Sequence, residues 1–114
     1  MSSTGFIPPA EALALAELIT PTERGIASRV LAKNGGGSVT LFAFDSGEGL
    51  SEHTAPFDAL VIVLDGSLDL TIGGQPVHAA PGSIVRMPAN VPHAVDAPVA
   101  SRMLLVMLRE PNKP

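Results

Sequence analysis

Short runs of alternating apolar and polar residues follow one another along most of this chain. In residues 67–72, for example, leucine or isoleucine at every second position alternates with serine, aspartate and threonine. A period of two is typical of a β-strand that buries one of its two sides. Further short runs of strand character lie at 25–33, 39–44, 50–53, 58–64, 75–79, 83–87, 93–97 and 101–108. About eight to ten short antiparallel strands, with no helix between them, predict an all-β sandwich or barrel.

One of these runs is apolar on both of its sides. Residues 59–64 read Ala-Leu-Val-Ile-Val-Leu. A strand of this kind must be covered on both faces. In a chain this short the second cover could be another copy of the protein, and residues 103–108 form a second apolar run. The two runs together predict a homodimer.

The N-terminal segment allows two structures. Residues 10–19 have a helix-forming composition, and Pro21 would end a helix there. The same segment could instead lie on the barrel as an extended arm. We therefore divide the chain into an arm or short helix at 1–24, a barrel domain at 25–108 and a polar tail at 109–114.

The composition narrows the classes of partner. The chain has 114 residues, a formal net charge of −4, and no cysteine, tryptophan or tyrosine. Without cysteine it can form neither disulfides nor thiolate metal sites. The acidic balance, the scattered Lys and Arg and the few aromatic rings argue against nucleic acid as a partner. No apolar run reaches the roughly 20 residues of a membrane span, and the N-terminus does not read as a secretory signal. We therefore expect no membrane partner and a cytoplasmic location.

Two histidines stand among glycines and prolines at regular spacings. The spacings are Gly49-x3-His53-x-Ala55-x10-Gly66 and Gly82-x5-Pro88-x4-His93. This pattern resembles the two motifs of the cupin superfamily, and the resemblance extends over about residues 25–108. It implies a jelly-roll barrel with a site in its mouth, often in a homodimer, as in small single-domain microbial cupins. The strand count agrees with that fold independently.

The resemblance also implies a metal site, and this sequence departs from it. The family's usual ligands are a His-x-His pair, a carboxylate and a further histidine, which fall by position at His53, Ala55, Ala59 and His93. Two of these four are alanine. Asp58 is one residue from the carboxylate position, and strand alternation would turn it to the opposite face. The departure weakens the case for the family's dioxygenase-type and isomerase-type chemistry.

Three interpretations of His53 and His93 stand at this point. They either hold a divalent metal (Zn, Ni, Fe or Mn) with help from water or a bound anion, or hydrogen-bond to water or a small ligand, or do not meet. The predicted ligand pocket consists of His53, Ala55, Phe57, Ala59, Met87 and His93.

We interpret the chain as a small cupin that binds a small polar molecule in the barrel mouth, with a divalent metal weakly held between the two histidines. The alternative is a metal-dependent enzyme of dioxygenase or isomerase type that acts on a small organic acid or sugar. The incomplete set of ligands favours binding over catalysis, and the sequence leaves open whether the chain is an enzyme.

The other residues with candidate chemistry are expected to have structural roles. His78 is expected at the surface or in an interface, and Arg86 at the surface. Glu52 is expected to face away from the pocket, so it is a poor candidate for a general base. Met87, Met103 and Met107 are expected to fill the core and not to act as ligands.

Overall fold

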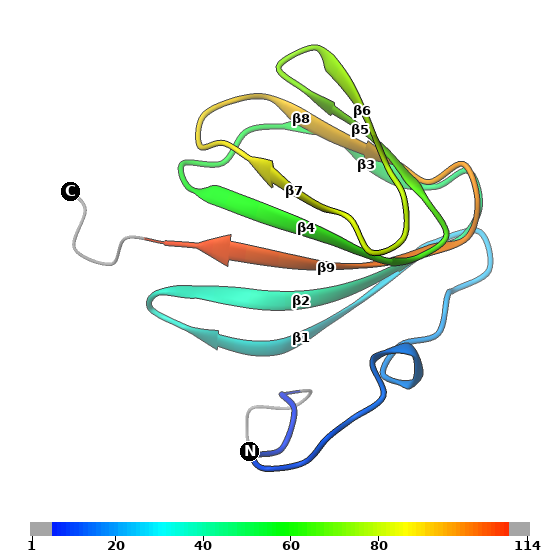
Figure 1. The fold of residues 1–114 in the computed structure, drawn as a ribbon, viewed down its shortest axis with the longest axis vertical. Helices are drawn as coiled ribbons and strands as arrows, with labels where there is room; N and C mark the ends of the chain where they lie inside the picture. The colour runs from blue at the N-terminus through cyan, green and yellow to red at the C-terminus, as the bar shows by residue number, and fades with distance from the viewer. Residues whose placement is uncertain (1–5, 110–114) are drawn as a thin grey trace.

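The computed structural model describes residues 6–109, and nearly all of their regular structure is β-strand. Two antiparallel sheets face each other as a barrel (Figure 1). The larger sheet contains, in spatial order, β1 (Ile26–Asn34), β2 (Gly37–Phe44), β9 (Ser101–Leu108), β4 (Asp58–Asp65) and β7 (Ile84–Met87). The smaller sheet contains β3 (Gly49–His53), β8 (His93–Asp96), β5 (Leu68–Ile72) and β6 (Gln75–Ala79). The predicted all-β barrel is confirmed.

The core lies between the two sheets and follows the period of two in the sequence. Val61 and Val63 of β4 are fully buried, and Leu68 and Leu70 of β5 meet them in the same apolar cluster. Asp69, between the two leucines, is exposed. Burying each of these aliphatic side chains stabilises the fold by about 1.5–3 kcal/mol.

Gly66 connects the two sheets at a point where a side chain would not fit. It lies in the turn between β4 and β5 with a φ of 73°, a left-handed conformation that favours glycine. A Cβ at this position would collide with the Ser101 hydroxyl and the Ala100 carbonyl. That hydroxyl accepts a hydrogen bond from the backbone N–H of Ser67 at 3.0 Å, so the turn packs directly onto the start of β9.

Of the two structures that the sequence allowed for the N-terminal segment, the structure has the extended arm, with a single 3-10 turn, η1 (Leu15–Glu17), in place of a helix over 10–19. The cap position of this turn, Ala14, makes no side-chain hydrogen bond, and an isolated helix of about ten residues is marginal in water. The segment gains more by docking Ile19, which is buried in a cluster with Leu31, Leu41 and Ala43 on the outer face of the larger sheet.

Two arginines fix the arm by its backbone. Arg29 donates to the carbonyl of Leu18 at 3.2 Å, and Arg102 donates to the carbonyl of Ile19 at 3.3 Å. These contacts attach the end of the arm to β1 and β9. Within residues 6–109, no helix has the length and apolarity needed to cross a membrane.

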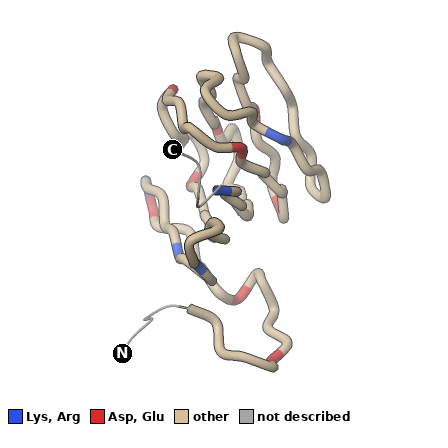
Figure 2. Tube along the Cα trace, turned by 90° about the vertical axis from the view of Figure 1, so that its left-hand side faces the viewer, with Lys and Arg blue, Asp and Glu red and all other residues tan. Residues whose placement is uncertain are grey.

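The arm covers only part of the outer face of the larger sheet. On β4 and its neighbours Ile62 pairs with Ile84 on one side and with Leu104 on the other. Ile84 is 60% exposed and Leu108 is 48% exposed. Charged residues are spread along the described trace without a concentrated patch of either sign (Figure 2). The uncovered part of this face thus exposes Ile84 and Leu108 to solvent, next to the ion pair of Arg86 and Asp58.

Candidate functional site

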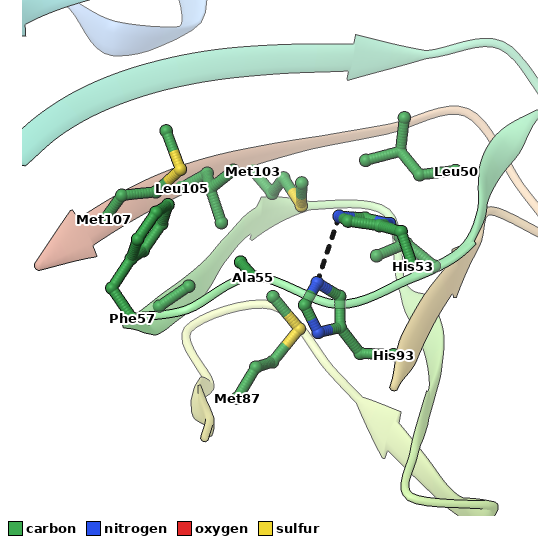
Figure 3. Close-up of a pocket in the computed structure, with 11 residues that line it drawn as sticks. Leu50, His53, Ala55, Phe57, Met87, His93, Met103, Leu105 and Met107 are labelled. Atoms are coloured by element: carbon green, nitrogen blue, oxygen red, sulfur yellow. Dashed lines mark hydrogen bonds between the residues drawn. The ribbon is translucent and has the colours of Figure 1, made fainter. Parts of the chain in front are cut away.

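The structure brings His53 and His93 together inside the barrel mouth (Figure 3). His53 ends β3, His93 begins β8, and the two residues are direct partners in the antiparallel pairing. Their Nε2 atoms are 3.1 Å apart, and their ring centroids are 4.3 Å apart. His93 is only 5% exposed, whereas His53 reaches the surface. The pair therefore connects the interior of the barrel to solvent.

The hydrogen bonds of the two rings determine which nitrogens carry protons. Nδ1 of His53 donates to the carbonyl of Ser51 at 3.0 Å, and Nδ1 of His93 donates to the carbonyl of Val91 at 3.2 Å. A carbonyl only accepts, so each Nδ1 holds the single proton of its neutral ring. With both Nδ1 atoms protonated, the two Nε2 atoms form a hydrogen bond only when one of the rings carries a second proton. The contact is satisfied by an added proton or by a metal ion between the two nitrogens.

Burial acts against the added proton at His93. Loss of hydration lowers the pKa of the His93 imidazole below its ordinary value, and a positive charge on His53 would lower it further. The Val91 carbonyl acts in the opposite direction without reversing the shift. His93 is therefore neutral at pH 7, which is the form that binds a metal ion.

The histidine pair lines one side of a cavity of about 50 Å³. All six residues of the predicted pocket lie around it, and five further residues complete the lining: Leu50, Val95, Met103, Leu105 and Met107. The histidines are the only polar side chains in this set. Inward-facing positions of β9 repeat every second residue, so the alternation along 103–107 was the signal that could have added its three residues to the prediction.

The outer edge of the cavity carries a positive charge. Phe57 lines the cavity, and the guanidinium carbon of Arg109 lies 5.0 Å from the centroid of its ring. The backbone N–H of Arg109 donates to the carbonyl of Gly36 at 2.8 Å, which fixes the end of β9 at this point. A cation over the face of an aromatic ring is attracted by the ring quadrupole. Arg109 had been assigned to the polar tail, because nothing local in the sequence connects it with Phe57.

The two alanines at the family's ligand positions line the cavity. Ala55 lies in the loop after β3, where its carbonyl accepts a hydrogen bond from the Asn90 N–H at 2.7 Å. Ala59 is buried in β4, directly opposite Met87 of β7 and Met107 of β9. Methyl groups therefore stand where the family usually places an imidazole and a carboxylate.

Asp58 does not replace the missing carboxylate. Its side chain accepts hydrogen bonds from the Ala89 N–H at 2.9 Å and from Arg86 at 3.0 Å. The Ala89 N–H and then Arg86 lower the pKa of the Asp58 carboxyl below its ordinary value. Asp58 thus fixes the loop after β7 from the outer side of the sheet, as the alternation of the strand predicts.

The two histidines could occupy two of the coordination positions of one metal ion. Two imidazole nitrogens bound to one tetrahedral metal ion lie about 3.3 Å apart, close to the separation of the two Nε2 atoms. The carbonyls at both Nδ1 atoms are the contacts that orient metal-binding histidines. Residues 6–109 contain no cluster of three or more His, Cys, Asp or Glu side chains able to hold a metal. Any further ligands would come from solvent, a bound molecule or side chains of another type.

The remaining candidates lie outside the cavity. His78 is exposed, and its Nδ1 lies 2.8 Å from a carboxylate oxygen of Asp69 on the smaller sheet. Arg86 is exposed and paired with Asp58. Glu52 is exposed as well. The surface positions expected for His78 and Arg86 agree with the structure.

Comparisons with known proteins agree with this architecture. The Cupin domain family matches residues 40–108. A conserved protein of unknown function from Streptococcus pyogenes is 33% identical, with 96% of each chain covered and a TM-score of 0.88. A cupin superfamily protein from Desulfitobacterium hafniense is 30% identical over 91% of this chain and 95% of that chain, with a TM-score of 0.85.

A third structure is similar to one part of a longer protein. The cupin 2 conserved barrel domain protein from Leptotrichia buccalis is 37% identical over 82% of this chain and 46% of that chain, with a TM-score of 0.79. No functionally curated protein matches the sequence. The family match covers more than half of the 114 residues, and the first two structures are similar over nearly the whole chain. The chain therefore belongs to the cupin superfamily.

Proposed function

We propose that this cupin binds a small molecule in the barrel mouth, with the polar end of that molecule at the histidine pair. Cupins often bind small molecules or metals. The observation that carries the proposal is the pair of Nε2 atoms, 3.1 Å apart and in hydrogen-bond contact with each other, on the wall of an otherwise apolar cavity. The two imidazoles are the only polar side chains of that lining, so the polar group of a bound molecule would meet them there.

The lining refines the chemistry of the ligand. A water molecule occupies about 30 Å³ of liquid, so a cavity of about 50 Å³ accommodates only a few non-hydrogen atoms. Its walls are methyl, thioether and phenyl groups apart from the two imidazoles. A molecule with one polar group and a short apolar remainder therefore matches it better than a sugar with hydroxyls on every carbon. The Arg109 guanidinium at the edge favours a ligand with negative charge.

We propose that a divalent metal ion, weakly held, sits at the Nε2 atoms of His53 and His93. Such an ion would supply a Lewis-acidic centre for the polar end of the ligand. The residues themselves orient the nitrogens and exclude water from the apolar side. With only two protein nitrogens, affinity for a divalent ion should be lower than in a site with four protein ligands.

Catalysis remains the alternative proposal. It would require the substrate or solvent to provide the ligands that Ala55 and Ala59 no longer provide. The lining contains no Asp or Glu, so His53 and His93 are the only groups in it that could act as a general base. The replacement of two of the family's four ligands by alanine supports a binding or sensing protein better than an enzyme.

Nitrogen NMR of the histidine rings tests the proposal directly. In protein labelled with ¹⁵N at histidine, addition of Zn²⁺ should shift the Nε2 signals of His53 and His93, and a short monocarboxylate should then shift them again. His78 is the internal control, because it lies outside the cavity. Shifts of His78 alone, or no shifts, would contradict the proposal. Activity toward small organic acids in the loaded protein would favour the enzyme instead.

A further inference from the structure

Three of the four methionines in the chain line the cavity that contains the histidine pair. Met87 comes from β7, and Met103 and Met107 come from β9. Figure 3 shows the thioethers of Met87 and Met103 on the two sides of the pair, while Met107 lies beside Phe57. Met103 is fully buried and Met87 is 3% exposed, so both sulfur atoms are held in the interior.

The register places methionine next to the lost carboxylate. Ala59, at the family's carboxylate position, is paired with Met87 on one side and with Met107 on the other. Met103 faces inward two residues before Leu105 on the same strand. An anionic oxygen ligand is thus replaced by a methyl group with neutral sulfur atoms around it.

The change of donor type changes which ion the cavity stabilises. Thioether and imidazole groups are neutral, and thioethers are soft ligands that select Cu(I). The cost of burying an ion rises with the square of its charge, so a divalent ion costs about four times as much as a monovalent ion. Without a carboxylate among the lining residues, a divalent charge would stay uncompensated in this apolar cavity. A soft monovalent ion avoids most of that cost.

We propose that the cavity is a binding site for monovalent copper, with Nε2 of His53 and His93 and the thioethers of Met87 and Met103 as its donors. This inference rests on the proposed role of the histidine pair and names monovalent copper as the ion that binds tightly there, while a divalent ion such as Zn²⁺ is held only weakly. Methionine is also an adaptable filler of apolar cavities, and that role alone predicts no preference among metals. The two roles are therefore separable by experiment.

The test is an anaerobic titration in which the protein competes with a chromogenic Cu(I) chelator, alongside a Zn²⁺ titration by calorimetry. We expect about one equivalent of Cu(I) per chain, bound at least about a hundredfold more tightly than Zn²⁺. Met87→Leu and Met103→Leu should each lower Cu(I) affinity at least about tenfold and leave Zn²⁺ affinity within about twofold. Leucine keeps nearly the same volume, so these variants should fold. The matched control is Met107→Leu, the same substitution in the same cavity beside Phe57, which should change neither affinity beyond about twofold.

X-ray absorption at the copper edge provides a measurement that needs no variant. Sulfur and nitrogen ligands together in the parent protein would support the inference, and a copper ion with nitrogen and oxygen ligands only would overturn it. Cu(I) affinity unchanged in both methionine variants would also overturn it. If Zn²⁺ binds at the histidines while Cu(I) binds no more tightly, this inference alone fails. If neither ion binds, the proposed role of the histidine pair fails with it.

Discussion

The smaller sheet lines the cavity with nitrogen donors, whereas the larger sheet lines it with methyl groups and thioethers. His53 and His93 lie on β3 and β8, which are adjacent in the smaller sheet. The larger sheet contributes Ala59, Met87, Met103, Leu105 and Met107. The two sheets therefore contribute different properties to one site. The imidazoles of the smaller sheet provide the atoms that bind a cation or a proton, and the neutral lining of the larger sheet determines which cation is stable there.

The outer faces of the two sheets differ as well. On the smaller sheet the exposed side carries polar residues such as Asp69 and His78. On the larger sheet the outer side exposes the apolar residues Ile84 and Leu108 beside the ion pair of Arg86 and Asp58, and the N-terminal arm covers only part of it. A sheet with one solvated face needs no further cover, whereas a sheet with two apolar faces needs one. Variants that alter the lining or the outer face of one sheet should therefore separate these properties.

Removal of either histidine should abolish the contribution of the smaller sheet to metal binding. His53→Ala and His93→Ala should each lower Zn²⁺ affinity more than about a hundredfold, because a single imidazole in an apolar cavity does not hold the ion. Calorimetric titration at pH 7.5 is the measurement. The matched control, His78→Ala, removes a histidine from the same sheet outside the cavity and should bind Zn²⁺ as the parent does. An unchanged affinity in both cavity variants would reject the histidine pair as the metal site.

New donors from the opposite side of the cavity should have the reverse effect. The double variant Ala55→His, Ala59→Glu should raise Zn²⁺ or Ni²⁺ affinity about a hundredfold, because each added ligand in a converging site is worth on the order of 1.4 kcal/mol. Both alanines line the cavity, and Ala59 is 4% exposed, so the added carboxylate would be buried beside the ion. Titration of variant and parent under the same conditions measures the gain. A folded variant that binds no better would show that these positions do not converge on the pair.

Acidification should weaken metal binding at the smaller sheet by at least about tenfold between pH 8 and pH 5. Protons compete with the metal for Nε2, and unperturbed imidazole titrates near pH 6.5. Because the pKa of His93 is lowered, this residue should keep its metal-binding form below that pH and lose it only as the pH approaches its own lower pKa. The measurement is Zn²⁺ affinity at several pH values in buffers that do not bind zinc. An affinity independent of pH would mean that other groups hold the ion.

A charged residue introduced on the outer face of the larger sheet should disrupt the proposed dimer and change the stability of the monomer little. We propose that a second copy covers the open face around Ile62 and Ile84, so the parent should have about twice the chain mass by light scattering. Ile84→Lys, at a position 60% exposed, should halve that mass and shift the free energy of unfolding of the monomer within about 0.5 kcal/mol. Val99→Lys, at an exposed position in the loop between β8 and β9, is the control and should leave the mass unchanged. A parent protein that is already monomeric at micromolar concentration would reject the dimer.

Much of the barrel could be predicted because strand alternation is local. The alternation of 67–72 indicated which side chains of β5 are buried, and the motif spacing indicated that His53 and His93 belong to one site. The sequence left both a helix and an extended arm open at 10–19, because the composition favours a helix while docking of Ile19 on the sheet favours the arm. Tertiary contacts outweigh helix propensity in a segment this short.

The sequence by itself determined the strands, the inward positions of alternating runs such as 67–72 and the replacement of two family ligands by alanine, since each depends on residue identity or on a period of two. Only the tertiary structure decided which strands are neighbours. β9 lies between β2 and β4, which puts Met107 beside Ala59, nearly fifty residues away in sequence. The same packing directs both Nδ1 atoms to carbonyls and leaves both Nε2 atoms facing each other. Pairing over such separations depends on how all the apolar faces are buried together, and a local pattern contains no information on that arrangement.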